Sequence, residues 1–215
     1  MKASTQRLVL AGPAGPLDVA IDEPQADRAG PRGVAVIAHP HPLFGGTMDN
    51  KVVQTLARAF VQCGWRAVRF NFRGVGASAG VYDHGHGELQ DLLAVVDAQA
   101  PGGALALAGF SFGAFVTSQA VARLFPQRAL DKVVLVGTAA SRFEVVPLAP
   151  ELHERTLVVH GEVDDTVPLA DVLSWARPQK LPVTVIPGVE HFFHGQLPLL
   201  RSLVVRHLLS ETAPS

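Results

Sequence analysis

The sequence lacks several features that mark particular classes of protein. Cys63 is the only cysteine among 215 residues, so no disulfide can form within the chain, and a zinc site built from cysteines is excluded. No run of basic residues occurs, and the formal net charge is -1, which argues against nucleic acid and anionic membranes as partners. No stretch reaches the roughly 20 uninterrupted apolar residues of a membrane-spanning helix. A reducing compartment fits this sequence best.

The N-terminal segment also lacks the core of a signal peptide. Its apolar run, Leu8–Ala11, stops at Gly12 and Pro13, which predicts a cytoplasmic protein. Internal repeats are absent as well. With 48% hydrophobic and 17% charged residues the chain is not disordered, and its length suits one domain over residues 1–215.

Short β-branched apolar runs alternate with segments of helical period from Gly33 onward. The runs predict strands over residues 34–39, 67–72, 104–110, 132–137, 156–161 and 183–188. The segments between them predict helices over residues 51–63, 88–99, 112–125, 169–176 and 196–209. Two further strands, 6–10 and 17–21, are expected to form an antiparallel hairpin at one edge. The pattern predicts an α/β protein with a mostly parallel sheet of about eight strands and helices on both faces.

Ligands of such sheets bind outside the carboxyl ends of the strands, and a candidate nucleophile lies there. The pattern GxSxG occurs at residues 76–80 and at 109–113. Only Ser111 follows a predicted strand and immediately precedes a predicted helix, the setting in which a serine hydroxyl is exposed at a sharp turn. Its structural alternative is a helix N-cap, which would need neither flanking glycine. Ser78 is interpreted as a turn residue.

Serine needs a base, and the base needs a group that fixes its tautomer. Asp164 and Asp165 follow the strand 156–161, and His191 and His194 follow the strand 183–188. Taken singly, these residues could solvate turns, cap a helix or serve a structural role. The chain order Ser, Asp, His is nevertheless that of α/β-hydrolases.

A wider set of motifs points the same way: HPHPLFGGTMDNKVV (39–53), RFNFRGVGASAG (69–80), DHGHGELQDL (83–92), GFSFG (109–113), HGEVDDTVP (160–168) and GVEHFFHG (188–195). In these motifs the sequence resembles small bacterial serine hydrolases of the α/β-hydrolase fold, and is similar to dienelactone hydrolases and small carboxylesterases. The resemblance implies that Asp164 is the acid and His191 the base, although Asp165 and His194 stay open from the residues alone. It implies cleavage of small carboxylic esters, thioesters or lactones through an acyl-enzyme, without a cofactor.

Two backbone N–H groups are expected to bind the oxyanion of the tetrahedral intermediate. The first belongs to Phe112, the residue after the candidate nucleophile. For the second, the loop of residues 39–46 offers no N–H at its two prolines, so we expect Leu43, with Phe44 next. His41 either lines the substrate pocket or is a loop histidine hydrogen-bonded to backbone.

The pocket itself is expected to be open and partly aromatic. Phe44, His41 and Phe192 are predicted to contact the substrate. Residues 138–155 are too few for a lid domain, which favours short acyl groups. The expected partner is therefore a small-molecule ester, and the expected state is a monomer or homodimer.

Three other readings are weaker. The closely spaced histidine pairs lack the accompanying carboxylate of a metal-binding helix, so no metal is expected. The glycine-rich residues 73–80 superficially suggest an NAD(P)-binding oxidoreductase, but no helix is predicted to begin at Gly80. A catalytically silent binding module of the same fold is the other alternative, and the presence of all three candidate catalytic residues argues against it.

Overall fold

The computed structural model describes residues 5–25 and 30–210. Its strands are β1 (Thr5–Gly12), β2 (Gly15–Asp22), β3 (Val34–Ala38), β4 (Arg66–Phe70), β5 (Leu105–Phe110), β6 (Lys132–Val136), β7 (Thr156–Gly161) and β8 (Val183–Ile186). Its helices are α1 (Lys51–Gln62), α2 (His86–Gln99), α3 (Phe112–Leu124), α4 (Leu169–Ala176) and α5 (Leu197–Leu209). Two 3-10 turns, η1 (Pro42–Phe44) and η2 (Pro150–Arg155), complete the described elements.

The strands form one sheet in the order β1-β2-β4-β3-β5-β6-β7-β8. β1 pairs antiparallel with β2, and β2 pairs antiparallel with β4. Every pairing from β4 across to β8 is parallel. This is the α/β-hydrolase fold, and the predicted strands, helices and edge hairpin are confirmed.

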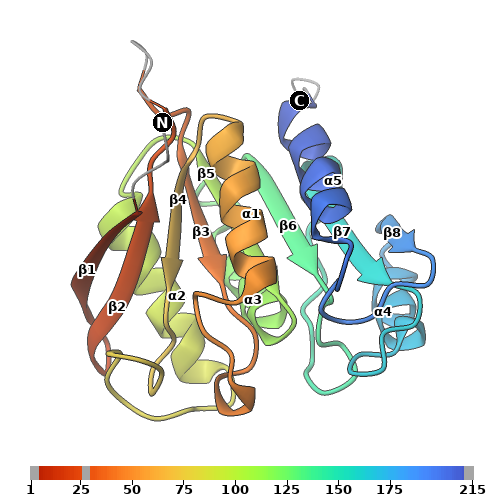
Figure 1. Ribbon diagram of the computed structural model, residues 1–215, viewed down its shortest axis with the longest axis horizontal. Helices are drawn as coiled ribbons and strands as arrows, with labels where there is room; N and C mark the ends of the chain where they lie inside the picture. Colours follow the sequence, from red (N-terminus) through yellow and green to blue (C-terminus); the bar gives the residue numbers. More distant parts are fainter. Residues whose placement is uncertain (1–4, 26–29, 211–215) are drawn as a thin grey trace.

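Helices cover both faces of the sheet (Figure 1). α1 and α5 lie side by side on one face, and α2, α3 and α4 lie on the other. β5, in the centre, shows why two covers are needed. Its Leu105 and Leu107 belong to the core under α2 and α3, whereas Ala106, Ala108 and Phe110 belong to the core under α1 and α5. Because successive side chains of a strand point to opposite faces, an uninterrupted apolar run is buried on both.

The carboxyl ends of the parallel strands meet at one edge of the sheet, the lower edge in Figure 1. The connections at this edge range from one residue, Ser111 between β5 and α3, to the 15 residues 71–85 between β4 and α2. The connection from β6 to β7 is held to the core by the buried side chains of Val145, Leu148 and Leu152, and it adds no lid domain. Across the described residues, none of the helices combines the length and the apolarity that crossing a bilayer requires.

Candidate active site

Ser111 lies at the sharp turn between β5 and α3. Its backbone is in an unusual conformation, with φ 57° and ψ -117°. The two flanking glycines make this turn possible, because the chain passes too close to itself for a side chain. A Cβ on Gly109 would lie closer than 3.0 Å to the carbonyl oxygen of Gly113, and one on Gly113 would crowd the carbonyl oxygens of Ala38 and His39 equally. The turn therefore requires the GxSxG pattern for steric reasons.

The Ser111 hydroxyl is hydrogen-bonded to His191. Its Oγ atom lies 3.0 Å from Nε2 of His191. Ser111 occupies the N-cap position of α3, but its side chain makes no capping bond there.

Asp164 completes a buried chain of hydrogen bonds. Its Oδ2 atom lies 2.6 Å from Nδ1 of His191, and its Oδ1 atom accepts from the N–H groups of Thr166 (3.0 Å) and Val167 (2.7 Å). Ser111, Asp164 and His191 are 7%, 5% and 2% exposed. With the carboxylate accepting at Nδ1, the neutral imidazole leaves Nε2 unprotonated and facing the serine.

The two alternative candidates, Asp165 and His194, take no part in these hydrogen bonds. Asp165 is exposed, and its side chain accepts only a long bond from the Thr166 hydroxyl, at 3.4 Å. The His194 side chain is 74% exposed and pairs with Glu190 at 2.9 Å. Partial burial opposes ionisation of Glu190, but hydrogen bonds from the N–H groups of His194 and Phe192 lower the pKa of Glu190. Glu190 thus shapes the turn that presents His191.

The loop after β3 is anchored by His39, whose side chain is fully buried. Its Nδ1 atom donates to the carbonyl oxygen of Pro40 (2.6 Å), and its Nε2 atom accepts from the N–H of Phe72 (3.0 Å). Burial lowers the pKa of His39 to about 4, so the ring is neutral at pH 7. A neutral imidazole with both nitrogens bonded ties the loop to the end of β4.

The prediction of Leu43 or Phe44 as an oxyanion donor needs correction. Residues 42–44 form the turn η1, which His41 caps. The N–H of Leu43 donates to Nδ1 of His41 (3.2 Å), and the N–H of Phe44 donates to the His41 carbonyl oxygen (3.1 Å). Both N–H groups are therefore used inside the loop. Within the described residues, the N–H of His41 itself has no protein acceptor.

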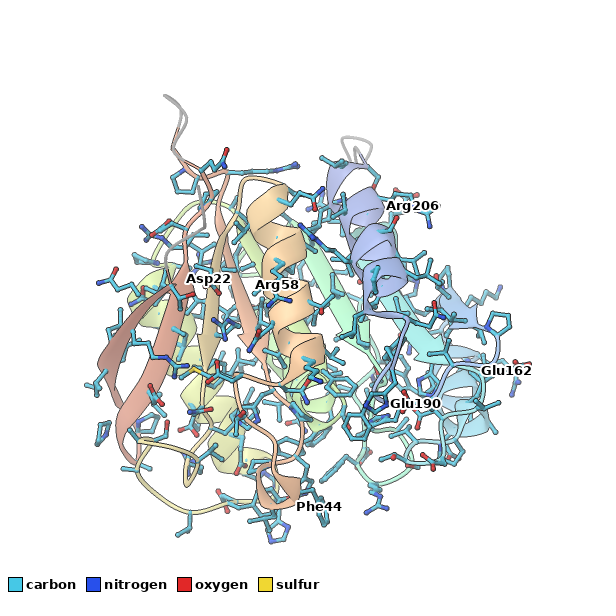
Figure 2. The ribbon with its side chains drawn as sticks, viewed as in Figure 1. Asp22, Phe44, Arg58, Glu162, Glu190 and Arg206 are labelled. Atoms are coloured by element: carbon cyan, nitrogen blue, oxygen red, sulfur yellow. The ribbon has the colours of Figure 1, made fainter. Side chains whose placement is uncertain are left out.

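A cavity of about 350 Å³ opens at Ser111 and His191. Its other lining residues are Pro40, His41, Phe44, Gly45, Gly46, Asn50, Phe112, Ala139, Arg142, Phe143, Thr166, Val167 and Phe192. The three predicted substrate contacts are thus brought together. Phe44 lines the cavity and is 74% exposed, so it forms part of the rim, and it lies at the opposite end of the molecule from Arg206 (Figure 2).

His41 both lines the cavity and is hydrogen-bonded to the backbone of its own loop, as the two alternatives for this residue predict. The ring lines the cavity, with its centroid 4.6 Å from that of Phe44 and 5.0 Å from that of Phe112, while Nδ1 caps the backbone of η1. Desolvation, and then the charges of Arg142 and His84, lower the pKa of His41. Arg142 has no signal in the sequence that marks it as a site residue, because its place depends on how residues 138–155 fold back.

The second GxSxG match is structural. Ser78 is buried, donates to the carbonyl oxygen of Asn71 (2.7 Å) and accepts from the N–H of Asp18 (3.0 Å), so it pins a turn against β2. No helix begins at Gly80, since α2 starts at His86. In the part of the chain that the structure describes, no group of three or more His, Cys, Asp or Glu side chains is placed to hold a metal.

Two solved structures closely resemble the whole chain. One is a protein of Xanthomonas campestris described as an α/β serine hydrolase without a lid, with 40% identity, a TM-score of 0.83 and coverage of 99% of this chain and 98% of that one. Another is an α/β serine hydrolase homologue of Coxiella burnetii, with 38% identity, a TM-score of 0.81 and coverage of 95% and 97%. The fold and these relatives define the protein as a lidless serine hydrolase of the α/β-hydrolase fold.

The family profile adds a second finding. Residues 16–146 match the profile of the X-Pro dipeptidyl-peptidase (S15) family, and the chain belongs to that family. The matched region contains Ser111 but ends before Asp164 and His191. An uncharacterised protein of Rickettsia prowazekii is also similar, with 33% identity over an alignment of 171 positions that covers 74% of this chain and 71% of that protein.

Proposed function

We propose that this serine hydrolase cleaves small carboxylic esters, with Ser111 as nucleophile, His191 as general base and Asp164 as the orienting acid. The observation that carries the proposal is the unbroken chain of hydrogen bonds from Ser111 through His191 to Asp164 at the floor of an open cavity. Thioesters and lactones share the reacting carbonyl and are close variants of the same substrate class.

The geometry supports the following sequence of steps. Ser111 Oγ attacks the ester carbonyl while Nε2 of His191 takes the hydroxyl proton. Asp164, which two backbone N–H groups hold in place, stabilises the imidazolium through Nδ1. The imidazolium then gives its proton to the leaving alcohol, which leaves an acyl-enzyme. Water, activated by the same Nε2 atom, releases the acid and restores Ser111.

The oxyanion of each tetrahedral intermediate requires preorganised donors. The N–H of Phe112, at the first residue of α3, is one donor. We assign the second to the N–H of His41, in place of Leu43, because η1 leaves that group free at the cavity wall. Pro40 and Pro42 flank His41 and restrict the loop, so the donor is held before substrate arrives.

The cavity favours esters over the peptides named by the family description. An enzyme that removes N-terminal dipeptides has to bind a free ammonium group, which calls for a carboxylate. No carboxylate lines the described cavity, and Arg142 places a positive charge there. An N-terminal ammonium would be repelled, whereas a neutral or anionic ester would not.

Fluorophosphonate labelling followed by a panel of p-nitrophenyl esters and X-Pro p-nitroanilides tests the proposal. We expect wild-type protein to be labelled on Ser111 and to hydrolyse the esters, and Ser111→Ala to lose both properties while Ser78→Ala retains them. A silent binding module or an NAD(P)-dependent enzyme would leave the serine unlabelled. Faster cleavage of the p-nitroanilides than of any ester would contradict the ester assignment.

A further inference from the structure

A second histidine, His160, is buried beside the Asp164 carboxylate. It stands one residue before the end of β7, and none of its surface is exposed. Its Nε2 atom lies 2.9 Å from the carbonyl oxygen of Val167 and 3.5 Å from Oδ2 of Asp164. The same Asp164 oxygen accepts the hydrogen bond from Nδ1 of His191, at 2.6 Å. The carboxylate thus lies between two imidazole rings.

The Val167 carbonyl fixes the protonation of His160. A carbonyl oxygen can only accept, so Nε2 of His160 carries the hydrogen. Nδ1 is then unprotonated, and among the described residues it has no hydrogen-bond partner. Burial lowers the pKa of His160, against the opposing effects of the Val167 bond and the Asp164 charge, so the ring is neutral at pH 7. His160 is therefore a neutral donor, held through Nε2.

Val167 connects the His160 donor to the Asp164 carboxylate. Its carbonyl oxygen accepts from His160, and its N–H donates to Oδ1 of Asp164 at 2.7 Å. His160 therefore holds the carbonyl side of Val167, the residue whose N–H orients the carboxylate. The Nε2 atom of His160 also lies 3.5 Å from Oδ2, so the donor borders the carboxylate directly.

We propose that His160 is a positioning residue for ester hydrolysis, which holds the turn of residues 164–167 so that Asp164 faces Nδ1 of His191. The inference rests on the proposed function, because the orientation of Asp164 matters only where His191 acts as a base. His160 is not among the residues that line the cavity. Its loss should therefore lower kcat and leave KM nearly unchanged.

Three substitutions separate this role from simple filling of the core. In His160→Gln the side-chain amide nitrogen reaches about as far as Nε2, whereas in His160→Asn it reaches only as far as Nδ1. His160→Leu fills much of the space without a donor. His153→Leu is the matched control. His153 lies on η2, and its Nε2 atom is also within hydrogen-bond distance of a backbone carbonyl oxygen, that of Leu148, at 3.2 Å. Fluorophosphonate titration of Ser111 gives the concentration of competent sites, so that kcat refers to folded protein.

We expect His160→Gln to keep kcat on p-nitrophenyl acetate within about threefold of wild type. In His160→Asn and His160→Leu, kcat should fall by about 10- to 100-fold while KM stays nearly constant. A loss of this size is typical of a displaced catalytic group. His153→Leu should keep wild-type kcat. Equal kcat in the Gln and Asn variants, or a loss confined to KM, would overturn the inference, and these two variants decide the question if His160→Leu does not fold. Wild-type protein that neither labels nor hydrolyses would instead overturn the proposed function, and this inference with it.

Discussion

The α-carbon of Gly137 lies against the imidazole of His191. A Cβ added at Gly137 would lie 3.2 Å from Cε1 and 3.3 Å from Nδ1 of that ring. Gly137 follows β6 directly, and its φ is 54°. The ring of Phe110 packs near that of His191, with ring centroids 4.9 Å apart, and the same Cβ would lie 3.2 Å from Cε2 of Phe110. The His191 ring therefore occupies space that a side chain at residue 137 would fill.

The first prediction concerns this contact. In Gly137→Ala the added methyl group should push His191 away from Ser111 and lower kcat by at least about 10-fold, since small displacements of catalytic groups are costly. Gly188→Ala is the control, because its φ of 67° imposes similar backbone strain with nothing within 4 Å of the added Cβ. Both variants should lose about 1 to 2 kcal/mol of unfolding free energy. Equal kcat in the two variants would show that the contact has no role.

The second prediction separates the two adjacent carboxylates and the two nearby histidines. Asp164→Asn and His191→Ala should each lower kcat by up to about 10⁴-fold, because the imidazole loses its orienting charge or is removed. Asp165→Asn and His194→Ala should stay within a few-fold of wild type, since both side chains are exposed. Steady-state kinetics on p-nitrophenyl acetate give the comparison, and similar losses from both aspartates would contradict the choice of Asp164.

The third prediction concerns the charge at the cavity mouth. Arg142→Ala should lower kcat/KM for an ester whose acyl group carries a carboxylate, such as a hemisuccinate, by about 2- to 5-fold, the size expected for an exposed ion pair. A neutral acetate ester should be unaffected. Arg58→Ala removes a charge from α1, away from Phe44 at the cavity rim (Figure 2), and is the control. The Arg142 effect should shrink in 0.5 M salt, and an effect that salt does not change would argue against direct attraction.

The fourth prediction concerns chain length. A cavity of about 350 Å³ without a lid covers only a short acyl group. Each further CH₂ contributes at most about 0.8 kcal/mol, and only while it finds apolar surface to cover. For p-nitrophenyl esters from acetate to palmitate, kcat/KM should peak at short chains and show no activation at lipid interfaces. A maximum at the longest chains would contradict this description of the cavity.

The fifth prediction follows from the buried His39. Burial depresses the pKa of His39 to about 4, below that of an unfolded histidine, so the unfolded chain takes up the proton first as pH falls. The stabilising effect of the neutral ring is present above about pH 6.5 and declines down to about pH 4, by roughly 2 kcal/mol at pH 5. Urea unfolding at pH 7.5 and pH 5 measures it. His39→Asn, which keeps a donor near the position of Nδ1, should show a smaller difference between the two pH values, and an unchanged difference would exclude His39 as the source.

The fold was predictable because the strands are buried on both faces. Uninterrupted apolar runs such as residues 105–110 identify them, and residues at the ends of parallel strands must meet at one edge. The sequence alone therefore indicates that Ser111, Asp164 and His191 lie together. The sequence pattern predicts the start of α2 two residues late, at Glu88, because the Glu88 carboxylate accepts from the N–H groups of Asp83 and Gly85 and so extends the first turn. The hydrophobic periodicity of a sequence does not report a local side-chain-to-backbone hydrogen bond of this kind.

Two features of the site could not be derived from the sequence in the same way: the backbone N–H that we assign as the second oxyanion donor, and the position of Arg142. Which N–H group of residues 39–46 stays free depends on η1, and η1 depends on a bond from the Leu43 N–H to the His41 ring. Arg142 reaches the cavity only because residues after it are buried and turn the loop back. Cytoplasmic location and a monomeric or homodimeric state stay predictions.

The buried anchors of the connection between β6 and β7 also bear on the timing of catalysis. The buried side chains of Val145, Leu148 and Leu152 fix this segment to the core, so it does not act as a mobile lid. In enzymes with mobile covers, opening or product release commonly limits turnover. If the proposed mechanism holds, substrate reaches Ser111 through the open cavity without a loop having to move, and we expect the bond-making and bond-breaking steps to limit turnover.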